Sequence, residues 1–118
     1  MTEASDVRIY HNPRCSKSRS ACSILQEHGI GAEVREYLKQ PPSREELAEL
    51  LRMLGMKPEQ IVRKGEAIYK EQYADRALTD DEWLDALAAN PILIERPIVV
   101  KGNRAVLGRP PEKVLELL

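Results

Sequence analysis

One cysteine near the start of the chain has the neighbours that make a thiol reactive. Cys15 lies in "YHNPRCSKSRSACSILQEHGI", where a short apolar run gives way to an amphipathic segment rich in Ser, Lys and Arg. The first turn of a helix offers unpaired N–H groups and partial positive charge, which stabilise a thiolate and a bound oxyanion alike. A fall in thiol pKa from about 8.5 to about 6.5 requires only ~2.7 kcal/mol. We therefore predict that Cys15 is a nucleophile at an anion site; the alternative is a small apolar residue at a bend.

The other cysteine and the two histidines carry weaker signals. Cys22 falls in an apolar part of the same segment, which predicts a buried and inert thiol. His11 is near Cys15 in sequence and is a candidate to tune its thiol, whereas His28 ends the predicted helix and complements its dipole. These four side chains match no paired-cysteine zinc spacing, so we predict no metal site.

Two arginines stand at the ends of predicted strands. Arg96 comes two residues before a strand predicted at 98–100, and Arg109 comes two residues after one predicted at 106–107. Open α/β sheets bind ligands at strand ends. The hypothesis is that both arginines converge on one anion.

The elements around Cys15 predict a βαβ unit. A strand at 7–10, with Val7 and Ile9 facing the core, is followed by a helix that ends at Gly29 and by a strand at 33–38. Two strands joined through a helix at this spacing are expected to pair in parallel.

The middle of the chain is predicted to be helical. Ser43 with Glu46 and Thr79 with Glu82 form capping boxes, and Gly55 ends the first of these two helices. The apolar positions of the two helices are Leu47, Leu50, Leu51, Leu54, Trp83, Leu84 and Leu87. Between them, one or two short helical turns are expected.

The last third predicts a β-hairpin turning at Gly102 and Asn103, followed by a final helix in "RPPEKVLELL". The order β-α-β, helical insertion, β-β-α predicts a small α/β fold with a mixed sheet. We expect one domain over residues 1–118, with a core at 6–38 and 92–118 and an insertion at 43–90.

The composition of the chain argues against several classes of protein. A net charge of −1 gives no general attraction to nucleic acid or to an anionic membrane, so we expect neither partner. No apolar run reaches membrane-spanning length, the polar residues "MTEASDVRIY" do not have the pattern expected of a signal peptide, and two cysteines are too few for a disulfide framework. These features predict a cytoplasmic protein.

Several longer motifs make the chain resemble a known family. "YHNPRCSKSR", "PPSREEL", "VRKGE", "LTDDEWLDALAANPILIERPIVV" and "LGRPPE" together resemble the glutaredoxin-coupled arsenate reductases over nearly the whole chain. The resemblance implies a thioredoxin/glutaredoxin-like fold with a helical insertion. Cys15 matches the family's nucleophile, and His11 matches a histidine that assists the thiolate. Pro97 matches the cis-proline that faces the active cysteine. The family's oxyanion-binding arginines correspond to Arg63, Arg96 and Arg109.

The resemblance also implies the substrate and the partners. Arsenate would react with Cys15, glutathione would act as co-substrate, and glutaredoxin would restore the thiol, with no bound cofactor. One alternative is a regulator similar to the Spx proteins, which bind RNA polymerase. Many of those carry a C-x-x-C switch, but Ser18 stands at its second cysteine position here. The other alternative is a thiol reductase of the same fold with a different substrate.

Overall fold

The computed structural model describes residues 7–117, which fall into two compact units. The first unit consists of residues 7–40 and 96–117, and the second is Pro41–Glu95. These boundaries lie within a few residues of those predicted for the core and the insertion. The organisation of the chain as one domain stays a prediction.

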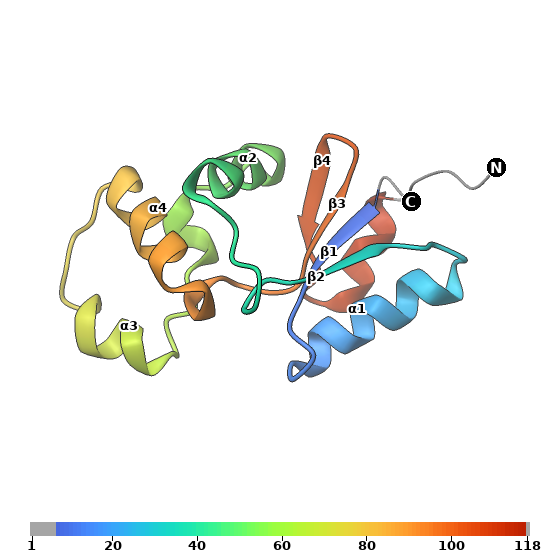
Figure 1. Cartoon of the computed structure of the whole chain (residues 1–118), viewed down its shortest axis with the longest axis horizontal. Coiled ribbons are helices and arrows are strands. Elements are labelled where there is room, and N and C mark those ends of the chain that lie inside the picture. Colours follow the sequence, from blue (N-terminus) through green and yellow to red (C-terminus); the bar gives the residue numbers. More distant parts are fainter. Residues whose placement is uncertain (1–6, 118) are drawn as a thin grey trace. The chain divides into compact units, whose positions relative to one another are not determined.

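The first unit is built on a four-stranded sheet with the order β2-β1-β3-β4 (Figure 1). Its strands are β1 (Val7–His11), β2 (Glu33–Glu36), β3 (Ile98–Lys101) and β4 (Arg104–Leu107). As predicted, β1 pairs with β2 in parallel, while β3 runs antiparallel to both β1 and β4. The sheet is therefore mixed, as the sequence indicated.

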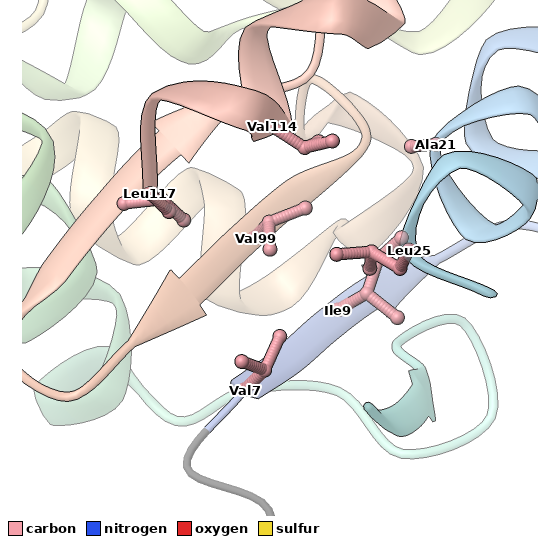
Figure 2. Packing of buried hydrophobic residues seen from close by; sticks show 7 residues of the cluster. All are labelled: Val7, Ile9, Ala21, Leu25, Val99, Val114 and Leu117. Atoms are coloured by element: carbon pink, nitrogen blue, oxygen red, sulfur yellow. The ribbon is translucent and has the colours of Figure 1, made fainter. Parts of the chain in front are cut away.

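The core of this unit lies between the sheet and the helical segments α1 (Ser16–Glu27) and η3 (Pro111–Leu117). Figure 2 shows side chains of the sheet pointing toward those of the two helical segments. The cluster consists of Val7, Ile9, Ala21, Leu25, Val99, Val114 and Leu117. The predicted core positions on the first strand are confirmed, because Val7 and Ile9 are almost fully buried.

Two predicted elements of this unit differ from those observed. The strand expected at 33–38 ends at Glu36, and the next residue, Tyr37, is fully buried in a turn. The expected final α-helix is a 3-10 helix, which begins with an i→i+3 bond from Lys113 N–H to the carbonyl oxygen of Pro110.

The second unit is helical. Its elements are α2 (Arg44–Leu54), η1 (Pro58–Ile61), α3 (Ala67–Gln72), α4 (Asp80–Ala89) and η2 (Pro91–Leu93). Helices α2 and α4 pack together, and Arg44 on α2 forms ion pairs with Asp81 and Asp85 on α4. The indole of Trp83 on α4 contacts the rings of Tyr69 and Tyr73.

The caps of these helices explain their bounds. Thr79 and Glu82 make both bonds of the predicted capping box, at 2.9 and 3.2 Å, and Ser43 Oγ accepts from Glu46 N–H at 3.1 Å. Gly55 ends α2 with a φ of 69°, a left-handed conformation that suits glycine. No helix within residues 7–117 is long and apolar enough to span a bilayer.

Candidate active site

One end of the sheet gathers the residues that could act on a ligand. The register pairs Tyr10 with Ile98, His11 with Glu36, and Ile98 with Leu107. Because of the strand directions, the segments after β1, β2 and β4 and the segment before β3 all leave the sheet at this end. This end therefore carries the loop before α1, together with Tyr37, Arg96 and Arg109.

The loop at residues 12–15 is held by hydrogen bonds in which the buried Asn12, only 5% exposed, is either donor or acceptor. The Asn12 N–H donates to Ser18 Oγ at 3.1 Å, and its side-chain Oδ1 accepts from Arg14 N–H at 2.9 Å. The Asn12 carbonyl accepts from Cys15 N–H at 3.0 Å. Asn before Pro favours such a turn because its side chain bonds to the backbone two residues on. These bonds fix Cys15 at the start of α1.

Cys15 is the N-cap residue of α1, with extended dihedral angles of φ −96° and ψ 123°. Partial burial acts to raise the pKa of its thiol. The Ser18 N–H, the Arg96 guanidinium and the Lys17 N–H outweigh burial and hold that pKa below its ordinary value. Helix-terminal N–H groups and a cation both stabilise a thiolate. The structure thus gives Cys15 the environment of a nucleophile.

Arg96 lies directly before β3 and forms a cis peptide bond with Pro97. Burial acts to lower the pKa of its guanidinium, but Tyr37 and Cys15 raise it above the ordinary value. Within residues 7–117, its buried Nε and Nη1 atoms have no hydrogen-bond partner. Buried donors without a partner are energetically unfavourable, so these atoms fit an anion bound beside Cys15.

Arg109 follows β4 and is brought to the same end of the sheet by a close backbone contact. The Gly108 N–H donates to the carbonyl oxygen of Pro97 at 2.8 Å. A Cβ atom on Gly108 would lie 2.8 Å from Cγ of Pro97, so only glycine permits this approach without a shift. The half-buried Arg109 follows at once, and its bond to Pro110 is also cis.

Arg63 belongs to the second unit and is already ion-paired there. Its guanidinium lies 3.2 Å from the Glu66 carboxylate and 3.1 Å from that of Glu95, and its side chain is 22% exposed. The Arg63 N–H donates to the carbonyl of Leu93 at 2.7 Å, beside the bridge between Val62 and Ile94. Its role in oxyanion binding stays a prediction.

The His11 imidazole contacts the second cysteine: Nδ1 of His11 lies 3.6 Å from Sγ of Cys22. Burial lowers the pKa of His11; the Glu36 carboxylate opposes this change and Arg19 adds to it. Cys22 is partly exposed rather than fully buried, and burial raises the pKa of its thiol. Burial thus favours the neutral thiol of Cys22, and its low reactivity stays a prediction.

The remaining charged and metal-binding candidates have ordinary surroundings. Arg19 is exposed and donates from Nη1 to the carbonyl of Pro13 at 2.9 Å, and His28 Nδ1 lies 3.0 Å from the carbonyl of Ile24. Within the described residues, no three His, Cys, Asp or Glu side chains are grouped as metal ligands.

Three residues of this site were not predicted. Asn12 and Ser18 fix the loop, and Tyr37 lies beside Arg96 with its side chain fully buried. The Asn-Pro pair was a readable turn signal for Asn12. Ser18 and Tyr37 are polar groups whose burial depends on contacts that the sequence does not display.

Comparison with known proteins assigns the family. Residues 10–117 match the ArsC family, and the chain belongs to it. The chain is 46% identical to the uncharacterized protein YfgD of Escherichia coli strain K12, over 95% of this chain and 96% of that protein. It is 44% identical to the arsenate reductase of Neisseria meningitidis, over 96% and 98% of the two chains.

The fold is confirmed by a solved structure. An arsenate reductase from Vibrio cholerae superimposes with a TM-score of 0.92 at 47% identity, covering 98% of this chain and all of that one. The thioredoxin-like fold of the ArsC proteins, expected from the resemblance, is therefore the fold of this chain.

Proposed function

We propose that the protein reduces arsenate to arsenite through Cys15, with glutathione as co-substrate and glutaredoxin as the partner that restores the thiol. Relatives that share over 40% of its sequence along nearly their whole length are named arsenate reductases. The observation that carries the proposal is the position of Cys15 at the start of α1, with its pKa lowered partly by Arg96.

Arsenate would bind as an anion against the start of α1. The buried Nε and Nη1 donors of Arg96 suit its oxygens, because a guanidinium forms paired, charge-assisted hydrogen bonds to tetrahedral oxyanions. Arg109 is proposed as a second cation at the same end of the sheet. Arg63 is proposed as a third on the resemblance alone. Their positive charge would also offset the repulsion between the anion and the thiolate.

In the first step, the Cys15 thiolate attacks arsenic(V), and one arsenate oxygen leaves as water after taking up protons. The new bond joins sulfur to arsenic, and arsenic remains in its oxidised state. His11 is proposed to assist this step from the neighbouring strand.

In the second step, a glutathione thiolate attacks the Cys15 sulfur. A disulfide forms, the sulfur–arsenic bond breaks with its electron pair on arsenic, and arsenite leaves. A glutaredoxin thiolate then attacks the glutathione sulfur and releases Cys15 as a thiolate. Both electrons come from thiols, so the proposed cycle needs no bound cofactor. The dependence on reduced glutathione fits a cytoplasmic location.

The alternatives are less well supported. Two of the relatives reported above are named arsenate reductases, and the partly buried guanidinium beside Cys15 suits an anionic substrate. A thiol reductase that acts on a different oxidised substrate would use the same Cys15. Only an assay with the substrate distinguishes this alternative from an arsenate reductase.

The proposal is tested by coupling turnover to NADPH oxidation with glutathione, glutaredoxin and glutathione reductase present. We expect oxidation that depends on arsenate and is abolished in Cys15→Ser. Arg104→Gln is the control for surface charge, since this exposed arginine donates to a backbone carbonyl, that of Glu116. Folded wild-type protein without arsenate-dependent oxidation would refute the proposal.

A further inference from the structure

His11 and Cys22 are within hydrogen-bonding distance, and the groups around them determine which of the two side chains donates. The two side chains come from adjacent elements, β1 and α1, and their Nδ1 and Sγ atoms lie 3.6 Å apart. This separation is normal for a hydrogen bond that involves the large sulfur atom. Such a pair can be an ion pair of thiolate and imidazolium, or a neutral pair in which either the thiol donates to Nδ1 or a protonated Nδ1 donates to the sulfur.

The surroundings of the pair favour the neutral form. Burial opposes charge on both partners, since it acts against the imidazolium of His11 and against the thiolate of Cys22. The charged groups that face His11 are Glu36 from β2 and Arg19 from α1, and they act in opposite directions. Burial outweighs the Glu36 carboxylate, so the pKa of His11 is lowered and the imidazolium of an ion pair is disfavoured.

Cys22 also lines a cavity of about 300 Å³, whose walls are mainly apolar and include Leu25, Ile30 and Val34, with Gln26 as the one polar side chain of the lining. A thiol is a weak donor and a weaker acceptor, whereas an unprotonated imidazole nitrogen accepts hydrogen bonds well. The favoured arrangement thus has the thiol as donor.

We propose that Cys22 is a positioning residue whose thiol donates a hydrogen bond to Nδ1 of His11 and keeps the imidazole in the tautomer protonated at Nε2. In that tautomer, Nδ1 carries the single basic lone pair of the ring, and the thiol occupies it. His11 can then donate a hydrogen bond from Nε2, but it does not take a proton from Cys15.

This consequence deepens the proposed function and rests on it, because it defines what the assistance by His11 consists of. Ionisation of Cys15 is left to Arg96 and to the N–H groups of Lys17 and Ser18, which lower its pKa. The tautomer itself follows from the contact alone and does not depend on the substrate.

The test is nitrogen NMR of the two imidazoles in folded protein labelled with nitrogen-15 in histidine. His28 provides an internal contrast, since its Nδ1 lies 3.0 Å from the carbonyl of Ile24 and must carry a proton to donate. We expect His11 to be protonated at Nε2 and His28 to be protonated at Nδ1 when each is neutral. His28→Gln assigns the signals.

Two substitutions at Cys22 separate donation from packing. In Cys22→Ala the donor is lost, so the Nδ1 signal of His11 should move downfield; in Cys22→Ser the hydroxyl restores a donor, and the signal should stay near its wild-type position. The His28 signals should not move in either variant. A proton on Nδ1 of His11, an imidazolium at neutral pH, or equal shifts in both variants would overturn the proposal.

The measurement is independent of arsenate chemistry. Protein inactive toward arsenate but with the expected tautomer would refute the proposed function and keep this inference. Active protein with the opposite tautomer would refute the inference alone.

Discussion

Replacing Arg96 should change the reactivity of Cys15 in opposite directions at low and high pH. The Arg96 guanidinium is one of the groups that stabilise the Cys15 thiolate. A hydrogen bond to a charged group contributes about 1.5–3 kcal/mol, and the lower end applies to a partly exposed thiol. Since 1.36 kcal/mol corresponds to one pKa unit, Arg96→Gln should raise the pKa of Cys15 by about one unit.

The higher pKa in Arg96→Gln changes the rate at which Cys15 is alkylated by iodoacetamide in two ways. Below both pKa values, one unit lowers the thiolate fraction tenfold, but a more basic thiolate is about threefold more nucleophilic for a Brønsted coefficient of about 0.4–0.5. Alkylation of Cys15 in Arg96→Gln should therefore be about threefold slower than in wild type at low pH. Above both pKa values, where both thiols are ionised, it should be about threefold faster.

The assay is iodoacetamide alkylation followed by tryptic digestion and mass spectrometry. The arginines and lysines around the site place Cys15 in a peptide of residues 15–17 and Cys22 in one of residues 20–35, so each thiol is followed separately. The wild-type midpoint for Cys15 should lie below that of an ordinary cysteine, and that for Cys22 should lie above it, from the directions of their pKa shifts.

Two matched variants complete the design. Arg96→Lys keeps the positive charge and should move the midpoint less than Arg96→Gln, whereas Arg104→Gln removes an exposed arginine and should not move it. An unchanged midpoint in Arg96→Gln, or the same shift in Arg104→Gln, would refute the assignment of Arg96 as the cation that stabilises Cys15.

Three further predictions concern packing, capping and substrate binding. Gly108→Ala should lower the free energy of unfolding by about 1–3 kcal/mol, measured in urea, because its Cβ would lie 2.8 Å from Pro97 Cγ. Thr79→Ala should lower it by about 1 kcal/mol, because α4 loses its N-cap hydrogen bond. Arg63→Gln should raise the KM for arsenate less than Arg96→Gln does, because Arg63 is already paired with two carboxylates. For Arg96→Gln, we expect about a tenfold rise in KM.

Each of these predictions has its own control. Gly31→Ala adds the same methyl group where nothing lies within 4 Å, so a loss equal to that of Gly108→Ala would contradict the steric argument. Thr79→Ser keeps the hydroxyl and should retain most of the stability. A larger rise in KM for Arg63→Gln than for Arg96→Gln would show that its ion pairs do not limit its contact with the anion.

The elements with short-range signals were predictable from the sequence. Thr79 and Glu82 form a capping box within one helical turn, and Gly102 supplies the positive φ of a two-residue hairpin turn. Such signals act between residues close in the chain, so the sequence displays them directly. The two strands around α1 and their parallel pairing follow from the same kind of local pattern.

The partners of the site residues were not predictable, because they depend on contacts distant in sequence. The Arg63 guanidinium pairs with Glu95, thirty-two residues away, and His11 contacts Cys22, eleven residues away. Charge and residue type gave candidates for a site, but they did not show which cations were already paired. Tyr37 illustrates the same limit, since its β-favouring type extended the predicted strand past Glu36.

The most direct test of the proposed chemistry is a single turnover without glutaredoxin. Wild-type protein is mixed with arsenate and glutathione, quenched in acid and mapped without reduction. We expect glutathione bound to the peptide of residues 15–17 when arsenate is present and little without it. Glutathione on the peptide of residues 20–35 instead, or the same amount on Cys15 with and without arsenate, would contradict Cys15 as the nucleophile that reduces arsenate.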